Sequence, residues 1–282
     1  MKKVMAMLLA TVLCVATFTA CGSEETGSKG TGTAPESTVS ESTQAGSEAE
    51  GDAASVETIT AGVLTVGTNA AFPPFEYIGD DGEPAGFDIA LIKAIGEKMG
   101  MEVKVQDMEF GSLVAAIGNK IDVAIAGMTI TEERKESVDF SDSYYEAVQY
   151  VIVLPDSDIA TAADLENKSI GVQLGTTGEI IAEDITGANV QSYDKAVDAV
   201  SDLINGRVQA VIIDKNPAEV FASKFEGKVV ALDGAQFAFE PEQYAIALPK
   251  GSPLAEKVNA ALAELKADGT FDALVQEYIV AE

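Results

Sequence analysis

The sequence predicts an α/β fold with mainly parallel strands from residue 57 onward, on three observations. Short runs of Val, Ile and Leu alternate with segments whose apolar residues recur at helical spacing. Such alternation of strands and helices is typical of a parallel sheet covered by helices. Residues 117–127 and 204–214 also share one plan, which is a helix end, a Gly/Asn turn with one basic residue and a buried strand. This echo indicates either two lobes of similar build or the helix–turn–strand unit common to α/β proteins.

The expected elements follow in order along this part of the chain. Strands are expected where short apolar runs occur, at 63–68, 103–105, 121–126, 170–172 and 208–213. Helices are expected at 89–99, 113–117, 197–205, 254–266 and 271–278. Asp88 directly precedes the first helical segment and is expected to cap it. Another helix is expected to begin at Thr129, because Thr129 and Glu132 have the spacing of a capping box.

The first 20 residues predict an export signal. Lys2 and Lys3 precede an apolar run over 4–20 that is short for a membrane span. The run ends in Phe18-Thr-Ala-Cys21, which resembles the lipobox at which bacterial lipoproteins are cleaved and acylated, although Phe18 replaces the usual aliphatic residue. The alternative is an ordinary signal peptide with an incidental Cys. We expect acylation of Cys21 and a protein anchored by lipid to the cell membrane, facing the outside.

Residues 22–56 predict a flexible tether. Gly, Ser, Thr, Ala and Glu dominate this segment, and it contains no aromatic residue. Such a composition buries too little apolar surface to offset the entropy of the chain, so we expect disorder. A flexible coil of this length spans roughly 30–35 Å. The tether would hold a folded domain near the membrane while leaving it free to turn.

Composition excludes several classes of function. The 282 residues contain no His, which rules out Ser-His-Asp and Cys-His catalytic sites and zinc sites built on imidazole. The net charge of −28 makes nucleic acid a poor partner. Only Cys21 would remain after cleavage of the signal, so the fold uses no disulfide. We expect no metal and no cofactor.

Two strand ends are followed by groups that could bind an anion. Arg134 comes shortly after the strand that ends near Gly127, and its planar guanidinium matches a carboxylate. Gly175-Thr-Thr-Gly178 follows the strand at 170–172 and opens a helix whose first amides could bind an anion. It lacks the Lys of a phosphate-binding loop, so phosphate is not implied. The alternative for Arg134 is a solvated residue paired with a Glu of its own helix.

An acid and several aromatic residues complete the candidate set. Asp214 ends its strand and could meet an ammonium group or cap the helix that follows Pro217; the pattern leaves both open. Phe72, Phe75 and Phe110 could wall a pocket or belong to the core. Taken together, an Arg with helix amides, an Asp and aromatic walls are the chemical complement of a free α-amino acid.

Seven segments of residues 57–282 match one known family in order. They are Asn69–Phe75, Gly86–Asp88, Ala126–Arg134, Asp139–Asp142, Gly175–Gly178, Asp214 and Gln243–Pro249. Through them the chain resembles the extracellular amino-acid-binding proteins of ABC importers, the family 3 solute-binding proteins. The resemblance implies a two-lobed clamp of the type II periplasmic-binding-protein class, joined by two crossing strands. The first lobe would hold 57–147 and 244–282 and the second 148–243, after a lipoprotein signal at 1–20 and the acylated tether at 21–56.

The resemblance also implies which residues bind the two charged groups of the amino acid. Arg134 would bind the α-carboxylate, assisted by Thr129 and the amides of Thr176 and Thr177. Asp214 would bind the α-ammonium, with the carbonyl of Gly127 as a second acceptor.

The same resemblance places the ligand side chain. Phe72 and Phe110 would sandwich it, and its tip would touch Asn69, Gln173 and Ile213. Met128 lies in the same segment as Gly127 and is included in the site. No residue is expected to be catalytic.

The implied mechanism is closure of two lobes on the ligand, after which the closed form docks on an ABC permease. Members that bind cationic amino acids usually carry an acid where Asn69 stands and Ser where Ala126 and Gly127 stand. Glutamine-binding members share Ala126–Thr129 but tend to have an acid, a Lys and a His at 69, 173 and 213, where this chain has Asn, Gln and Ile. We therefore expect a monomer that binds a neutral amino acid, polar or moderately apolar.

Two other functions stay open on the same fold. Some relatives are dehydratases of cyclic acids, and the acids near the implied cleft are Glu76, Glu146 and Glu179, each expected to be a solvated surface residue. The second alternative is a module that senses a ligand and reports it through a partner. We expect binding without catalysis.

Overall fold

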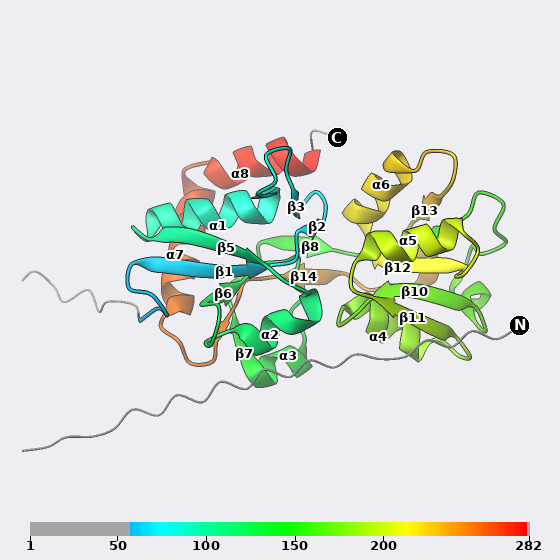
Figure 1. Ribbon diagram of the computed structural model, residues 1–282, viewed down its shortest axis with the longest axis horizontal. Helices are drawn as coiled ribbons and strands as arrows, with labels where there is room; N and C mark the ends of the chain where they lie inside the picture. The colour runs from blue at the N-terminus through cyan, green and yellow to red at the C-terminus, as the bar shows by residue number, and fades with distance from the viewer. Residues whose placement is uncertain (1–56, 281–282) are drawn as a thin grey trace, which may run out of the picture. The chain divides into compact units, whose positions relative to one another are not determined.

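The computed structural model describes residues 57–280 (Figure 1). The predicted signal peptide, the acylation site Cys21 and the predicted tether at 22–56 lie outside the described residues. None of the helices within 57–280 is long and apolar enough to cross a membrane.

The first five-stranded sheet has the order β5-β1-β6-β15-β7. Its strands are β5 (Glu102–Asp107), β1 (Val63–Thr68), β6 (Val123–Ala124), β15 (Ala247–Pro249) and β7 (Val138–Phe140). β1 pairs in parallel with β5 and β6, whereas β15 runs antiparallel to β6 and β7. Every residue of β1 is buried, because α1 (Phe87–Lys98) and α2 (Leu113–Ala116) lie on opposite faces of the sheet (Figure 1).

The second sheet repeats this plan with the order β11-β10-β12-β9-β13. Its strands are β11 (Asn189–Tyr193), β10 (Ser169–Gln173), β12 (Ala210–Asp214), β9 (Gln149–Val153) and β13 (Val230–Leu232). β10 pairs in parallel with β11 and β12, and β9 runs antiparallel to β12 and β13. α5 (Ala196–Ile204) and α6 (Lys215–Lys224) cover one face, and α4 (Thr177–Asp184) covers the other (Figure 1).

The predicted two-lobed, mainly parallel α/β architecture is confirmed. Each sheet with its helices forms one lobe, and in each sheet a single strand opposes the direction of the other four. The echoing segments 117–127 and 204–214 contain β6 and β12, which are the middle strands of the two sheets. The echo in the sequence therefore reflects the repeated plan of the two lobes.

Two strands cross between the lobes, as predicted. β8 (Tyr145–Ala147) and β14 (Glu242–Tyr244) form an antiparallel pair and run between the two sheets (Figure 1). β8 leads into β9 and β14 leads into β15, so each crossing strand continues into the one opposed strand of a sheet.

The remaining elements belong to the first lobe or to short connections. α3 (Glu132–Ser137) precedes β7, and α7 (Leu254–Ala267) and α8 (Thr270–Val275) close the lobe, followed by a π-helical turn over Gln276–Val280. β2 (Ala71–Phe72), β3 (Glu76–Ile78) and β4 (Pro84–Ala85) form a small sheet. Short 3₁₀ turns occur at Phe110–Ser112, Ala162–Leu165 and Gly234–Phe237.

The start of α1 corrects one expectation about a helix cap. Asp88 is the second residue of α1 and Gly86 is its N-cap, so Asp88 does not cap the helix. Its buried Oδ2 instead accepts hydrogen bonds from the Gly127 amide at 2.8 Å and the Tyr144 hydroxyl at 2.8 Å. Gly86 has a φ of 113°, and a Cβ there would lie 2.4 Å from the Phe75 carbonyl oxygen, so the chain needs glycine at this turn.

The start of α3 and the extent of β6 correct two further expectations. α3 begins at Glu132, and its N-cap is Thr131, whose hydroxyl accepts from the Arg134 amide at 3.1 Å. Thr129 is therefore not the cap; its backbone forms a bridge with Tyr244 on β14. Only Val123 and Ala124 of the strand expected at 121–126 are paired as a strand.

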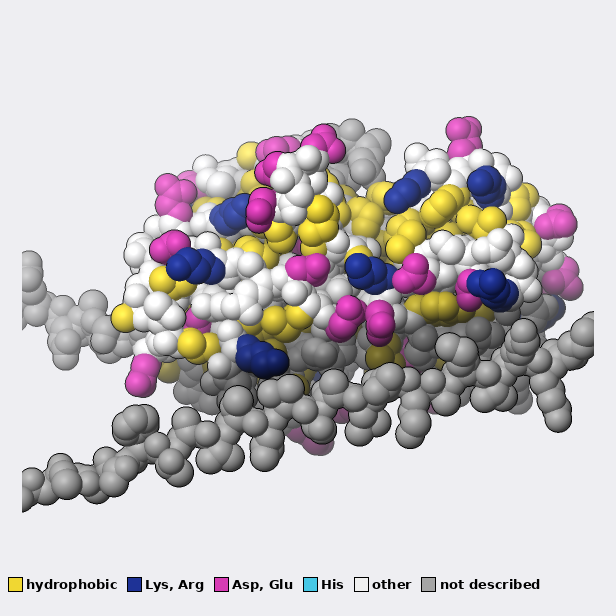
Figure 2. Space-filling view, in the orientation of Figure 1, with side chains coloured by type: hydrophobic (Ala, Val, Ile, Leu, Met, Phe, Trp, Pro, Cys, Tyr) yellow, Lys and Arg dark blue, Asp and Glu magenta, His cyan; other side chains and the backbone are white. Residues whose placement is uncertain are grey.

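On the side of the molecule shown in Figure 2, acidic side chains lie over both lobes, with single lysines and arginines among them. The core is apolar and lies mostly between sheets and helices, with Phe75, Phe87 and Tyr244 among its largest fully buried side chains.

Candidate functional site

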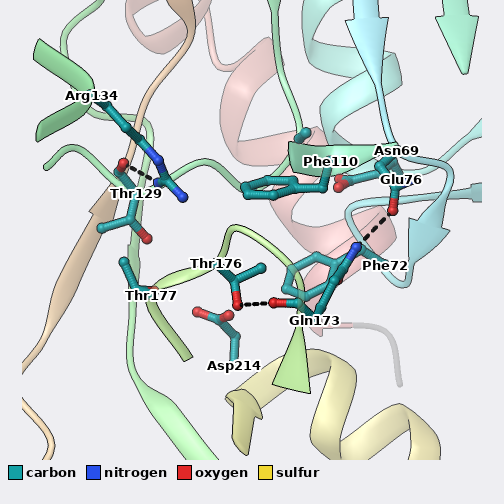
Figure 3. A pocket seen from close by; sticks show the side chains of 12 residues that line it. Asn69, Phe72, Glu76, Phe110, Thr129, Arg134, Gln173, Thr176, Thr177 and Asp214 are labelled. Carbon is teal, nitrogen blue, oxygen red and sulfur yellow. Dashed lines mark hydrogen bonds between the residues drawn. The ribbon is translucent and has the colours of Figure 1, made fainter. Parts of the chain in front are cut away.

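One pocket gathers residues of both lobes where strands of the two sheets end. β1 ends at Thr68, β10 at Gln173 and β12 at Asp214, and open α/β sheets place their ligand sites at such carboxyl ends. The residues that line the pocket are Asn69, Phe72, Glu76, Phe110, Ala126, Gly127, Thr129, Arg134, Gln173, Thr176, Thr177 and Asp214 (Figure 3).

Arg134 reaches into this pocket from the first lobe (Figure 3). Its Nη1 donates to the Thr129 carbonyl at 2.6 Å and its Nη2 donates across the lobes to the Gly175 carbonyl at 2.9 Å. The guanidinium lies 5.3 Å from the centre of the Phe110 ring, in cation–π contact. Burial lowers the pKa of Arg134, and the nearby Glu242, Asp214 and Glu133 oppose that shift. The side chain is thus fixed as a fork whose remaining donors suit a carboxylate.

The start of α4 places backbone amides of the second lobe where they could bind an anion. The helix runs over Thr177–Asp184 with Thr176 as N-cap, and the Thr176 hydroxyl accepts from the Glu179 amide at 3.3 Å. The predicted helix start at 175–178 is therefore present. Thr177 is the first residue of the helix, where amides are not used by the helix itself and the macrodipole is positive.

Asp214 ends β12 and carries a buried carboxyl group. It stands at the N-cap position of α6 but makes no side-chain capping bond, and its Oδ1 accepts no hydrogen bond from the described residues. Burial, together with the charge of Glu242, raises the pKa of Asp214 to about 7, and the side chains of Tyr244 and Gln149 oppose the shift. A buried acceptor without a hydrogen bond destabilises the folded protein, and a ligand that donates to it removes that cost. The Asp214 carboxyl group is therefore suited to bind an ammonium group.

Glu242 lies on the crossing strand β14 and joins the two sides of the pocket. Its Oε2 accepts from the Thr129 hydroxyl at 2.6 Å and from the Thr177 hydroxyl at 2.8 Å. Thr129 belongs to the first lobe and Thr177 to the second. The residue itself is partly buried, and nothing in the local sequence pattern pointed to it.

Two side-chain amides, those of Asn69 and Gln173, lie on the side of the pocket away from Arg134. Gln173 Nε2 donates to Asn69 Oδ1 at 2.9 Å, and Asn69 Nδ2 donates to the Met108 carbonyl at 2.8 Å. Phe110 and Phe72 are both nearly buried and line the pocket (Figure 3). This part of the site is neutral and semi-polar.

A pair of buried carboxyl groups lies at and behind the pocket wall. Glu76 is fully buried and lines the pocket, which corrects the expectation that it is a solvated surface residue. Burial, with the nearby Asp88 and Asp214, raises the pKa of Glu76 well above its usual range. Burial also raises the pKa of Asp88 to about 6, although the Gly127 amide and the Tyr144 hydroxyl oppose the shift. Both shifts favour the neutral acids over the carboxylates.

Comparison with known proteins decides the family. Residues 64–281 match the family model of the bacterial extracellular solute-binding proteins, family 3. The chain belongs to this family.

Individual members are similar over most of their length. The arginine-binding extracellular protein ArtP of Bacillus subtilis (strain 168) is 37% identical over 224 residues, which are 78% of this chain and 87% of that protein. The L-cystine-binding protein TcyJ of Escherichia coli (strain K12) is 33% identical over 226 residues, covering 78% of this chain and 84% of that one. A solved structure of an ancestral arginine-binding protein bound to arginine superimposes with a TM-score of 0.72 at 42% identity, covering 77% of this chain and 98% of the other.

In this family 3 solute-binding protein, ten of the twelve residues selected from the sequence line the pocket. Met128 and Ile213 do not line it. Successive side chains of a strand point to opposite faces, so Ile213 packs in the core while its neighbour Asp214 faces the pocket. Met128 likewise packs in the apolar cluster of the first lobe with Phe110 and Leu113.

The other acids named for a possible enzyme lie elsewhere in the family 3 protein. Glu146 is exposed on β8, and Glu179 accepts from the Gly175 amide at 2.6 Å and from the Ser192 hydroxyl. Within residues 57–280, no group of three or more His, Cys, Asp or Glu side chains could hold a metal ion.

Proposed function

We propose that this protein captures a free amino acid between its two lobes and delivers it to an ABC-type permease. The observation that carries the proposal is the placement of Arg134 and Asp214. The guanidinium comes from the first lobe and the carboxyl from the second, and both face one pocket. A zwitterion bound there would join the lobes through its two charged groups, so its binding would favour the closed arrangement.

We assign the charged groups of the ligand as the sequence suggested. Arg134 and the first amides of α4 would bind the α-carboxylate, and Asp214 with the Gly127 carbonyl would bind the α-ammonium. Phe72 and Phe110 would hold the side chain. The lobes would move about the crossing strands, with 57–147 and 244–282 on one side of the hinge and 148–243 on the other.

The ligand we propose is neutral, either polar or moderately apolar. Arg134 is the only basic residue among those that line the pocket, and the far side carries the neutral Asn69–Gln173 pair. The rival ligand is arginine, which ArtP is named for binding and which would place a second cation beside those amides.

A thermal-shift screen of the purified protein, refolded to strip ligand, tests the proposal. The probes are the twenty free amino acids and cystine. A ligand at 100 times its dissociation constant stabilises the folded state by about 2.7 kcal/mol, which raises the melting temperature measurably. A shift with one or a few neutral amino acids supports the proposal. A shift with arginine or lysine alone would reassign the ligand, and no shift with any probe would reject an amino-acid receptor.

We further propose that the protein acts without catalysis. Of the three acids named for a dehydratase, only Glu76 lines the pocket. Burial raises the pKa of Glu76, so its neutral form is favoured over the carboxylate that a general base needs. Neither of the other two acids lines the pocket to act as that base. Incubation with prephenate and arogenate should give no product. Turnover of either compound would make the protein an enzyme. Uptake of the amino acid should fall when the protein is deleted, and unchanged uptake would favour a sensory role.

The proposed location is the outer face of the cell membrane, through a lipid on Cys21, with the protein acting as a monomer. Mass spectrometry of the wild-type protein isolated from the membrane should show acyl chains on residue 21. Cys21→Ala should release the protein into the medium. Retention of the variant at the membrane would contradict the anchor.

A further inference from the structure

Glu242 makes contacts that the proposed binding scheme does not use. It lies on β14, one of the two crossing strands, and its Oε2 accepts from the hydroxyls of Thr129 at 2.6 Å and Thr177 at 2.8 Å. One carboxylate oxygen thus connects the first lobe, the second lobe and the strand between them. The Asn69–Gln173 and Arg134–Gly175 bonds also cross between lobes, but neither includes a crossing strand.

The direction of these hydrogen bonds fixes the chemistry of the two threonines. A hydroxyl has one proton, so a hydroxyl that donates to Glu242 can only accept on its other side. Gln149 Nε2 lies 3.3 Å from Thr177 Oγ1 and donates to it, which also requires the Thr177 proton to point elsewhere. Both threonines line the pocket. Toward a ligand they therefore offer lone pairs, which suit an ammonium and not a carboxylate.

We propose that Glu242 is a positioning residue that latches the two lobes together and dedicates the hydroxyls of Thr129 and Thr177 to the ammonium side of the ligand. This inference rests on the proposed function, because it names which part of an amino acid the hydroxyls meet. It changes the role expected for the Thr129 hydroxyl, from assisting Arg134 to assisting Asp214. The α-carboxylate is then left to Arg134 and the amides of α4.

The charges around the pocket agree with this division. Glu242 lies near enough to Asp214 to raise the pKa of that carboxyl group, so two acids act on the same region. The charges of Glu242 and Asp214 both act on Arg134 as well, and each opposes the lowering of its pKa by burial. An ammonium that enters between them gains from both negative charges, whereas a ligand without an ammonium leaves them unneutralised.

The latch is tested first without any ligand. Small-angle scattering of the full protein, stripped of ligand, compares the wild type with Glu242→Leu, Thr177→Val and Glu240→Gln. Glu242→Leu removes both arms of the latch and Thr177→Val removes the arm to the second lobe. Glu240→Gln is the matched control, because it removes an exposed charge two residues away. A larger radius of gyration in the first two variants supports the latch, and four equal radii would overturn it.

The orientation of the hydroxyls is tested with matched probes. These are L-glutamine with glutaramate and L-arginine with 5-guanidinopentanoate, in which each second compound lacks the α-ammonium. In Glu242→Leu we expect the affinity for the amino acid to fall about 10- to 100-fold and that for the deaminated partner to fall less than about threefold. Glu242→Gln keeps a carbonyl acceptor without the charge, so its affinity for the amino acid should lie between those of the wild type and Glu242→Leu.

The ratio of the two affinities separates this role from a merely structural one. A variant that only loosens the pocket would weaken both partners of a probe pair equally, and an unchanged ratio would therefore overturn the orientation of the hydroxyls. If the wild type binds none of the four probes, the ligand is neither glutamine nor arginine, and the matched pair is made from the amino acid that the thermal-shift screen identifies. The scattering comparison decides independently whether Glu242 latches the lobes.

Discussion

Gln173 of the second lobe donates a hydrogen bond of 2.9 Å to the side-chain oxygen of Asn69 in the first lobe. The two amides lie on the side of the pocket away from Arg134, and both residues are buried (Figure 3). Because the pair is neutral and already hydrogen-bonded, it offers no charge to the tip of a ligand. The pair is therefore the part of the site that would decide between a neutral and a cationic side chain.

Asn69→Asp should shift preference toward cationic amino acids. The substitution keeps the oxygen that accepts from Gln173 and loses the donor to the Met108 carbonyl. A new carboxylate in a largely buried site should improve binding of arginine relative to glutamine by about tenfold or more. Calorimetric titration of both amino acids measures the ratio. An unchanged ratio would mean that the ligand side chain does not reach Asn69.

Arg134→Ala should abolish tight binding. By analogy with a broken buried ion pair, loss of the guanidinium costs about 3–5 kcal/mol, or roughly 10²–10³-fold in affinity or somewhat more. Arg207→Ala is the control, since Arg207 is exposed and pairs with Asp202 far from the pocket-lining residues. A change of less than tenfold in Arg134→Ala would remove Arg134 from the carboxylate site.

Asp214→Asn should weaken binding and yet stabilise the ligand-free protein at alkaline pH. The pKa of Asp214 is raised to about 7, so the folded state binds a proton that the unfolded chain releases near pH 4. The stability contributed by this group is full below about pH 4 and is lost as the pH rises through about 7. Asn does not titrate, so the Asp214→Asn variant avoids this loss. Its free energy of unfolding should exceed that of the wild type by about 1–4 kcal/mol at pH 8, and the two proteins should differ little at pH 4.

Urea denaturation of ligand-free protein at the two pH values provides that comparison. Equal differences between wild type and Asp214→Asn at pH 4 and pH 8 would show that Asp214 is ionised without penalty. In binding assays, the variant should lose more affinity for an amino acid than for its deaminated analogue.

Binding of an amino acid should weaken as the pH falls below about 7. The ammonium needs the charged form of Asp214, whose pKa of about 7 reflects burial and the charge of Glu242. The charge of Asp214 also acts on Tyr244, Tyr145, Glu76 and Arg134. Burial raises the pKa of Tyr244, Tyr145 and Glu76, which favours their neutral forms. Affinity should fall by at most about tenfold per pH unit. A flat profile from pH 5 to 8 in the wild type would contradict this role, and Asp214→Asn should have a flat profile.

Gly86→Ala should destabilise the first lobe more than Gly82→Ala does. Both glycines have positive φ, at 113° and 84°, but a Cβ at Gly86 would lie 2.4 Å from the Phe75 carbonyl oxygen while one at Gly82 meets nothing within 4 Å. Strain alone costs about 1–3 kcal/mol, and the clash adds to it at Gly86 only. Denaturation by urea measures both variants. Equal losses would show that backbone strain alone requires glycine before α1.

The fold was largely predictable because its signals are local. Apolar runs marked three strands of the first sheet and two of the second, and the echo between 117–127 and 204–214 marked the middle strand of each. The other five strands, β7, β9, β11, β13 and β15, were not predicted. The errors came where a tertiary contact overrides a local pattern. Asp88 sits where a cap is expected, but its partners Gly127 and Tyr144 lie 39 and 56 residues away in the sequence.

The site was predictable to a similar extent and for similar reasons. Strand ends and a helix start marked Arg134, Asp214 and Thr177, which the structure brings to one pocket. Glu242 was missed because an acid on a short strand carries no local signal, and its partners Thr129 and Thr177 are 113 and 65 residues away. Glu76 was predicted at the surface because single acids are mostly exposed, whereas here it begins β3 and is fully buried.

The position of β15 also sets an order of assembly during synthesis. β15 lies between β6 and β7, so the first sheet cannot close until residues 247–249 have left the ribosome. The second sheet needs nothing beyond β13, which ends at Leu232. A growing chain can therefore complete the later lobe first, while β6 and β7 wait as unpaired edges. Glu242, which accepts from the pocket residues Thr129 and Thr177, is made just before β15, so these two hydrogen bonds form only near the end of translation.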